Sequence, residues 1–92
     1  MFVTFNFKIS KTFNEWSDFY DNDIAEKKDI IASLGIKPVF RASNVDSPED
    51  VIICWETPNK AIIEQFMAEN EANIAKSGHI IESTVLSFFD DA

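Results

Sequence analysis

The apolar and polar positions of this chain form one pattern that occurs twice. Each copy has an alternating, strand-like run, a longer segment with apolar residues three and four positions apart, a glycine, and a second strand-like run. The first copy comprises Phe2 to Ile9, Thr12 to Leu34, Gly35 and Ile36 to Ala42, and the second comprises Val51 to Glu56, Thr57 to Ser77, Gly78 and Ile80 to Phe88. This βαββαβ order predicts the ferredoxin-like fold, an α+β architecture.

The connections between these segments constrain the sheet. The polar segment from Ser43 to Glu49 is too short for a crossover helix and predicts a hairpin between the two copies. Two right-handed crossovers then give a four-stranded antiparallel sheet in the order 4-1-3-2, with both helices on one face. We therefore expect a single domain over residues 1–92.

Both predicted helices carry end signals. Thr12 and Glu15 have the spacing of a capping box, and the glycine of each copy is suited to a left-handed C-terminal cap. Thr57 is expected to cap the second helix, with Pro58 in its first turn. The run from Asp21 to Asp23 is a poor helix former and is expected to loosen the middle of the first helix.

One face of the predicted sheet has no helix to cover it. The first strand is apolar on one face (Val3, Phe5, Phe7, Ile9), and the third and fourth strands carry apolar residues on both faces. An exposed apolar face on a small domain is typical of an interaction surface, and pairing about a two-fold axis covers it symmetrically. The pattern therefore predicts a homodimer formed through the sheet face.

Composition and charge narrow the choice of partners. The net charge of −8 repels phosphate backbones, so we expect no nucleic-acid partner. No run approaches the roughly 20 apolar residues of a membrane span, and the N-terminal residues do not form a targeting signal, so we expect a cytoplasmic protein without a membrane partner. The single cysteine, Cys54, lies in an apolar run and is interpreted as a buried hydrophobic residue.

The stretch from Trp16 to Ile81 resembles the dimeric α/β-barrel superfamily, which includes antibiotic-biosynthesis monooxygenases, haem-degrading monooxygenases and many uncharacterised small proteins. The residues that carry the resemblance are Trp16 with Phe19-Tyr20-Asp21, Leu34-Gly35-Ile36, Cys54-Trp55-Glu56-Thr57 with Ala61 and Phe66, and Ala75-Lys76-Ser77-Gly78-His79-Ile80. The resemblance implies two ferredoxin-like subunits whose sheets face each other, with a pocket between sheet and helices in each subunit.

The haem-degrading branch of that superfamily is matched only in part. The resemblance sets Asn6 at the position of that branch's asparagine and Phe66 at or near the position of its tryptophan. The position of its histidine falls near Ala75 or Lys76, whereas the chain's only histidine, His79, lies beyond the second helix. Without an imidazole to ligate iron we expect no haem, and we predict no other cofactor and no metal site.

Five residues are candidates for a ligand-binding site: Asn6, Trp16, Trp55, Phe66 and His79. Asn6 points into the pocket if the apolar face of its strand forms the dimer contact, and into the dimer if that face meets the helices. Trp16 has the spacing of a core residue, whereas Trp55 ends a strand beside a helix start. His79 is compatible with a general base or with a surface or capping residue.

The leading functional hypothesis is a homodimer that binds a small, partly apolar ligand between sheet and helices. The alternatives are a cofactor-independent monooxygenase or isomerase acting on an aromatic or polyketide-like substrate, and a purely structural or interaction module. No set of residues in the sequence identifies a catalytic group.

Overall fold

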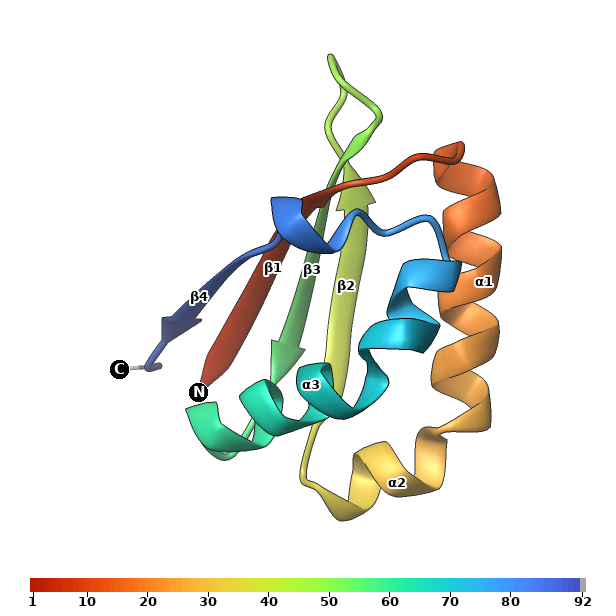
Figure 1. Ribbon diagram of the computed structural model, residues 1–92. Helices are drawn as coiled ribbons and strands as arrows, with labels where there is room; N and C mark the ends of the chain where they lie inside the picture. Colours follow the sequence, from red (N-terminus) through yellow and green to blue (C-terminus); the bar gives the residue numbers. More distant parts are fainter. Residues whose placement is uncertain (92) are drawn as a thin grey trace.

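The structure, a computed structural model, describes residues 1–91 and contains one four-stranded antiparallel sheet in the order β2-β3-β1-β4 (Figure 1). The strands are β1 (Phe2–Lys8), β2 (Lys37–Ser43), β3 (Asp50–Glu56) and β4 (Val85–Phe89). The helices are α1 (Phe13–Glu26), α2 (Lys28–Ser33) and α3 (Lys60–Lys76), and η1 (Ile81–Ser83) is a short 3₁₀ turn. Read from its other edge the sheet is 4-1-3-2, so the α+β, βαββαβ prediction is confirmed.

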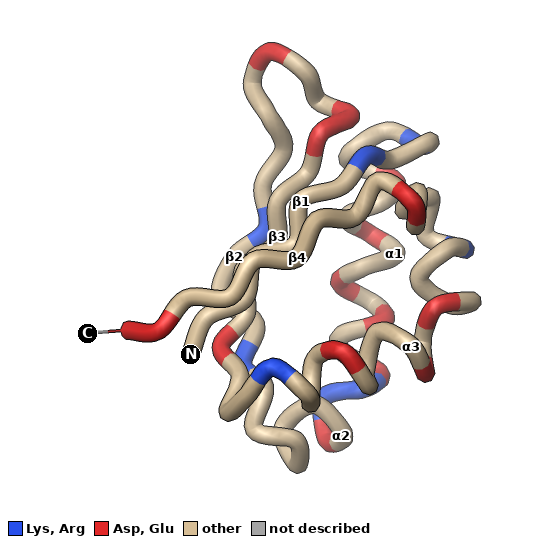
Figure 2. Tube along the Cα trace, turned by 60° about the vertical axis from the view of Figure 1, so that its left-hand side comes forward, with Lys and Arg blue, Asp and Glu red and all other residues tan. Residues whose placement is uncertain are grey.

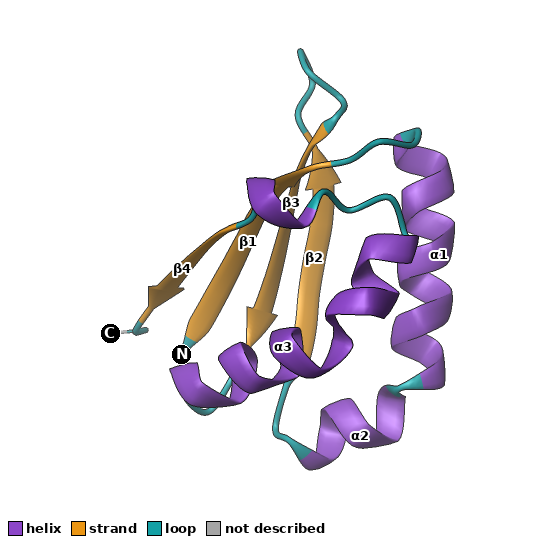
Figure 3. Ribbon diagram, in the orientation of Figure 1, coloured by secondary structure: helices purple, strands orange, loops and turns teal. Residues whose placement is uncertain are grey.

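Helices α1 and α3 lie on the same face of the sheet, and α2 lies beyond the end of α1 (Figure 3). The apolar residues of β1 point toward these helices: Val3, Phe5 and Phe7 are buried in the core. Antiparallel partners share a face, and Phe5 is paired with Ile53 on β3. The core is therefore the layer between the sheet and α1 and α3.

The opposite side of the sheet is called here the open face, because no helix among residues 1–91 covers it (Figure 3). Asn6 is exposed on this face, opposite Ile52 of β3 and Val85 of β4. The strand register places the other members on this face: Phe2, Thr4, Phe40, Ala42, Cys54, Ser87 and Phe89, with the charged residues Lys8, Lys37, Asp50 and Glu56 toward the strand ends. The structure thus decides between the two orientations of β1, in favour of the one that turns Asn6 away from the helices.

The predicted N-terminal capping box of the first helix is confirmed. The left-handed conformation predicted for the two glycines is confirmed as well. The Thr12 hydroxyl accepts from the Glu15 backbone N–H, and the Glu15 carboxylate accepts from the Thr12 backbone N–H. Gly35 and Gly78 have φ angles of 75° and 95°, a region that side chains with a Cβ rarely adopt.

The first helix differs from its prediction. It ends at Glu26, and α2 follows Lys27, whereas the run from Asp21 to Asp23 lies in regular helix. The two aspartates have partners outside their own turn, with Asp21 bound to Arg41 and Asp23 to Asn73, so they do not compete for the helix backbone. The change of direction at Lys27 brings Ile31 of α2 into the core.

Two further boundaries differ from the prediction. Asn59, and not Thr57, caps α3: its side-chain oxygen accepts from the backbone N–H of Ile62 at 3.0 Å. The Thr57 hydroxyl is buried and donates to the carbonyl of Asn59, so it is not available to the helix. The last strand begins at Val85 instead of Ile80, because residues 81–83 form η1.

Charged residues lie mainly outside the centre of the sheet. Figure 2 shows acidic residues in the loop between β2 and β3, along the helices and near the C-terminal end, while the middle of each central strand carries none. No helix among residues 1–91 is long and apolar enough to cross a membrane.

Candidate ligand pocket

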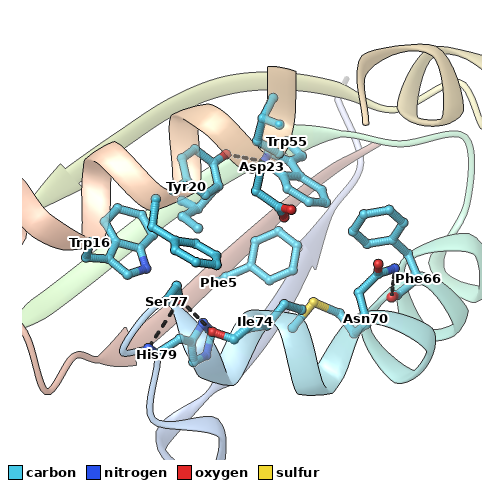
Figure 4. Close-up of a pocket in the computed structure, with 14 residues that line it drawn as sticks. Phe5, Trp16, Tyr20, Asp23, Trp55, Phe66, Asn70, Ile74, Ser77 and His79 are labelled. Carbon is cyan, nitrogen blue, oxygen red and sulfur yellow. Dashed lines mark hydrogen bonds between the residues drawn. The ribbon is translucent and has the colours of Figure 1, made fainter. Parts of the chain in front are cut away.

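A cavity of about 50 Å³ lies between the sheet and the two long helices (Figure 4). Its lining comes from β1, β3, α1, α3 and the segment that follows α3. A volume of this size holds on the order of four water molecules and is smaller than the roughly 150 Å³ cavity that encloses a benzene ring. As it stands, the cavity therefore admits only a very small molecule, or part of a larger one.

Aromatic side chains, His79 included, make up half of the lining. Six of the lining side chains are carbocyclic or indole rings, namely Phe5, Trp16, Phe19, Tyr20, Trp55 and Phe66. They are held by contacts with each other: the Trp16 and Tyr20 rings stack with centroids 5.0 Å apart, and Trp55 meets Phe5 edge to face at 4.9 Å. Such geometry is favourable for aromatic pairs and gives the cavity fixed walls.

Tyr20 and Trp55 form a polar contact within this apolar wall. The indole N–H of Trp55 donates to the Tyr20 hydroxyl at 2.8 Å, which joins β3 to α1. Burial raises the pKa of Tyr20 to about 12, because the phenolate is poorly solvated there. Tyr20 is therefore a neutral hydroxyl at physiological pH.

His79 lies at the other end of the cavity and is 6% exposed. Its ring stacks on Phe7 with the planes 3° apart, and its Nε2 is hydrogen-bonded to the Thr84 hydroxyl. Burial lowers the pKa of His79 to about 4, since the charged imidazolium loses its hydration. The interpretation of His79 as a surface residue is thus wrong, and at neutral pH its ring is uncharged.

The outer rim of the cavity is more polar. Asp23 of α1 accepts from the Asn73 side-chain amide of α3 at 2.7 Å and forms an ion pair with Lys27 at 3.0 Å. Asn70, also on the rim, donates to the backbone carbonyl of Phe66 at 2.8 Å. The Asp23 to Asn73 hydrogen bond connects the two helices beside the opening.

The structure brings together four of the five sequence candidates. Trp16, Trp55, Phe66 and His79 all line the cavity. Asn6 does not, because it lies on the open face, where the alternation of β1 places it. Trp16 belongs both to the core and to the lining.

The single cysteine, Cys54, does not line the cavity. Cys54 is buried on the open face, and burial raises the pKa of its thiol, so it fits the interpretation as a small buried residue. Within residues 1–91, no cluster of three or more His, Cys, Asp or Glu side chains is arranged to hold a metal ion.

Several polar lining residues were missed in the sequence: Tyr20, Asp23, Asn70 and Ser77. Asn70 carried a detectable signal, since it interrupts the apolar row formed by Phe66 and Ile74 at intervals of four. Asp23 gave no comparable signal, because its role depends on Asn73, which lies 50 positions away on another helix.

Comparisons with known proteins assign a family. A family model described as "Domain of unknown function (DUF3764)" matches residues 2–91, nearly the whole chain. No curated protein and no solved structure matches the chain.

Proposed function

The chain belongs to the DUF3764 family, and we propose that this domain is a homodimer that binds a small, partly apolar molecule in the cavity between its sheet and helices. The observation that carries the proposal is a cavity of about 50 Å³ bounded by the aromatic core. Protein interiors are close-packed and contain few voids larger than a water molecule. A molecule that fills a cavity of about 50 Å³ gains packing contacts worth on the order of 1 kcal/mol.

The lining also supports ligand binding in its distribution of polarity. Ligand sites are typically apolar with a few placed polar groups, and this cavity combines aromatic walls with Tyr20, His79 and Asp23 at separate points. The rim residues Met67 and Ile74 are only half-buried. Met67 is unbranched and adapts its conformation easily, so the opening is able to widen.

The ligand proposal is tested by a fragment screen followed through backbone amide resonances. We expect bound fragments to shift the signals of cavity residues, and we expect Ile74→Phe, which fills the space, to abolish those shifts. The matched control is Ala75→Phe, the same substitute side chain at the exposed neighbouring position on α3. If fragments bind equally well to the Ile74→Phe protein, the cavity is not the site.

The dimer is supported by the open face. Its exposed apolar residues include Phe40 at 49%, Val85 at 60% and Phe89 at 54%, with Phe2 and Ile52 half-buried among them. The strand register puts the charged residues of this face at the strand ends, so burying its centre desolvates no charged side chain. Pairing of two open faces matches the arrangement that the resemblance to dimeric α/β-barrel proteins implies.

The dimer proposal is tested by the mass of the protein in solution. We expect light scattering at micromolar concentration to give twice the chain mass, and Val85→Lys on the open face to shift the mass toward the monomer. Ile30→Lys on α2 is the control, because Ile30 is equally exposed, at 59%, but lies away from the open face. A wild-type monomer, or equal dissociation by both variants, would contradict the proposal.

A further inference from the structure

One donor on the cavity wall makes no hydrogen bond to the protein. The Trp16 side chain is 1% exposed, and its indole N–H forms no hydrogen bond with any of residues 1–91, in contrast to Trp55, which donates to Tyr20. Every fully enclosed side-chain nitrogen and oxygen in the described chain has a partner, so the Trp16 nitrogen must retain access to the cavity that this residue lines. Figure 4 shows this nitrogen on the side of the indole toward Ser77 and His79.

A second donor in the lining is also free. The Tyr20 oxygen accepts from Trp55, and its own O–H has no acceptor among the described residues. Ser77, by contrast, donates to the Ile74 carbonyl and accepts from the His79 backbone N–H. Two donors on the cavity wall, the Trp16 indole N–H and the Tyr20 O–H, are therefore open to an acceptor on a ligand.

The charge of the lining disfavours ionised ligands. The lining residues include one carboxylate, Asp23, and no lysine or arginine. The net charge of the chain is −8, so a carboxylate or phosphate ligand would enter against an unfavourable potential without a counter-charge. A cation finds no free anion either, because Asp23 is already bonded to Lys27 and Asn73.

We propose that the cavity binds a neutral carbonyl compound, whose oxygen accepts a hydrogen bond from the Trp16 indole N–H while its hydrocarbon part packs against the aromatic walls. A carbonyl oxygen is an acceptor without a hydrogen to donate, so it satisfies Trp16 and introduces no new unpaired donor. This inference rests on the proposed ligand-binding function and specifies the chemistry of its ligand.

The cavity is too small for a ring-sized ligand unless a side chain on its rim moves. A five- or six-membered ring exceeds the volume of about 50 Å³, so binding displaces a rim side chain. Met67 is half-buried on the rim and has no branch to hinder a change of rotamer. The hydrocarbon part of the ligand then occupies the position that Met67 leaves, and the carbonyl reaches inward.

The experiment compares three probes of similar size: cyclopentanone, its isostere methylenecyclopentane, which lacks the oxygen, and cyclopentanecarboxylate. Each is titrated into the ¹⁵N-labelled protein while the two indole N–H signals, of Trp16 and Trp55, are followed. We expect cyclopentanone to bind about tenfold more tightly than methylenecyclopentane, the worth of one net hydrogen bond. The Trp16 indole signal should move strongly with the ketone, and the already bonded Trp55 signal should move less.

The variant Trp16→Phe removes the donor and keeps an aromatic ring. It should reduce the affinity for cyclopentanone to that for methylenecyclopentane, with little change for the hydrocarbon. If this variant does not fold, the wild-type comparison of the two probes still decides. Equal affinity for ketone and hydrocarbon, or tightest binding by the carboxylate, would overturn the carbonyl inference while leaving ligand binding in the cavity supported. Absence of binding by all three probes also overturns it, and the fragment screen with Ile74→Phe then decides the broader function separately.

Discussion

Trp55 of β3 donates its indole N–H to the hydroxyl of Tyr20 on α1, at 2.8 Å. Trp55 is buried, so removing the hydroxyl leaves an enclosed donor without a partner. We expect Tyr20→Phe to lower the free energy of unfolding by about 1 to 3 kcal/mol, measured by urea denaturation. A double-mutant cycle with Trp55→Phe isolates the contact, and strictly additive effects of the two substitutions would mean that the hydrogen bond contributes nothing.

The ionisation of Tyr20 gives a second, independent check on its environment. Its pKa is raised from 10.0 to about 12, mainly by burial, so the folded state favours the neutral form. The associated stability is complete below pH 10.0 and is lost as the pH rises through about 12. Because Tyr20 is the only tyrosine, near-ultraviolet absorbance follows it directly. A midpoint near 10 in the folded protein would show that the hydroxyl is solvated.

His79 makes the free energy of unfolding depend on pH in the acidic range. Its pKa is lowered from 6.5 to about 4 by burial, so the unfolded chain takes up a proton at higher pH than the folded protein does. The corresponding stability is complete above pH 6.5 and is lost as the pH falls through about 4. As the only histidine, it is followed by the NMR signals of its ring.

The variant His79→Phe separates this histidine from the carboxyl groups that titrate in the same range. Phenylalanine preserves a ring against Phe7 but cannot take up a proton. Between pH 6.5 and 4 the variant should lose less stability than the wild-type protein does. Identical pH profiles would show that His79 is not responsible for the dependence.

The cap of α3 is testable by a pair of asparagine substitutions. Asn59 accepts from the Ile62 backbone N–H at 3.0 Å, so Asn59→Ala should lower the free energy of unfolding by about 1 kcal/mol. Asn14→Ala, at an exposed position within the first turn of α1, should have little effect or raise it slightly, since alanine is the better helix former. Equal losses for both substitutions, measured by urea denaturation, would contradict the capping role.

Much of the architecture is encoded in local spacing. The capping box at Thr12 and Glu15 depends on residues three positions apart, and the positive φ of Gly35 and Gly78 depends on the residue type itself. The cap at Asn59 was not predicted, because Thr57 has equally suitable chemistry. It is excluded only by its burial and by its hydrogen bond to the Asn59 carbonyl.

The candidate site was predictable where its residues belong to regular apolar patterns. Trp16 and Trp55 were identified because aromatic residues at core spacing, or at the junction of a strand and a helix, have few other environments in a small domain, whereas Phe66 was identified through the resemblance to the haem-degrading branch. The free indole N–H of Trp16 was not predictable. Whether a buried donor has a partner depends on which side chains from other elements reach it.

Sequence alone determined that Val3, Phe5 and Phe7 share one face of β1 and that Asn6 lies on the other, because the side chains of a strand alternate with a period of two. Only the tertiary structure decided which face meets the helices, since that choice depends on the direction of both crossovers and on packing against Trp16 and other distant residues. The same long-range packing left the cavity beside Trp16 and turned Asn6 toward the open face.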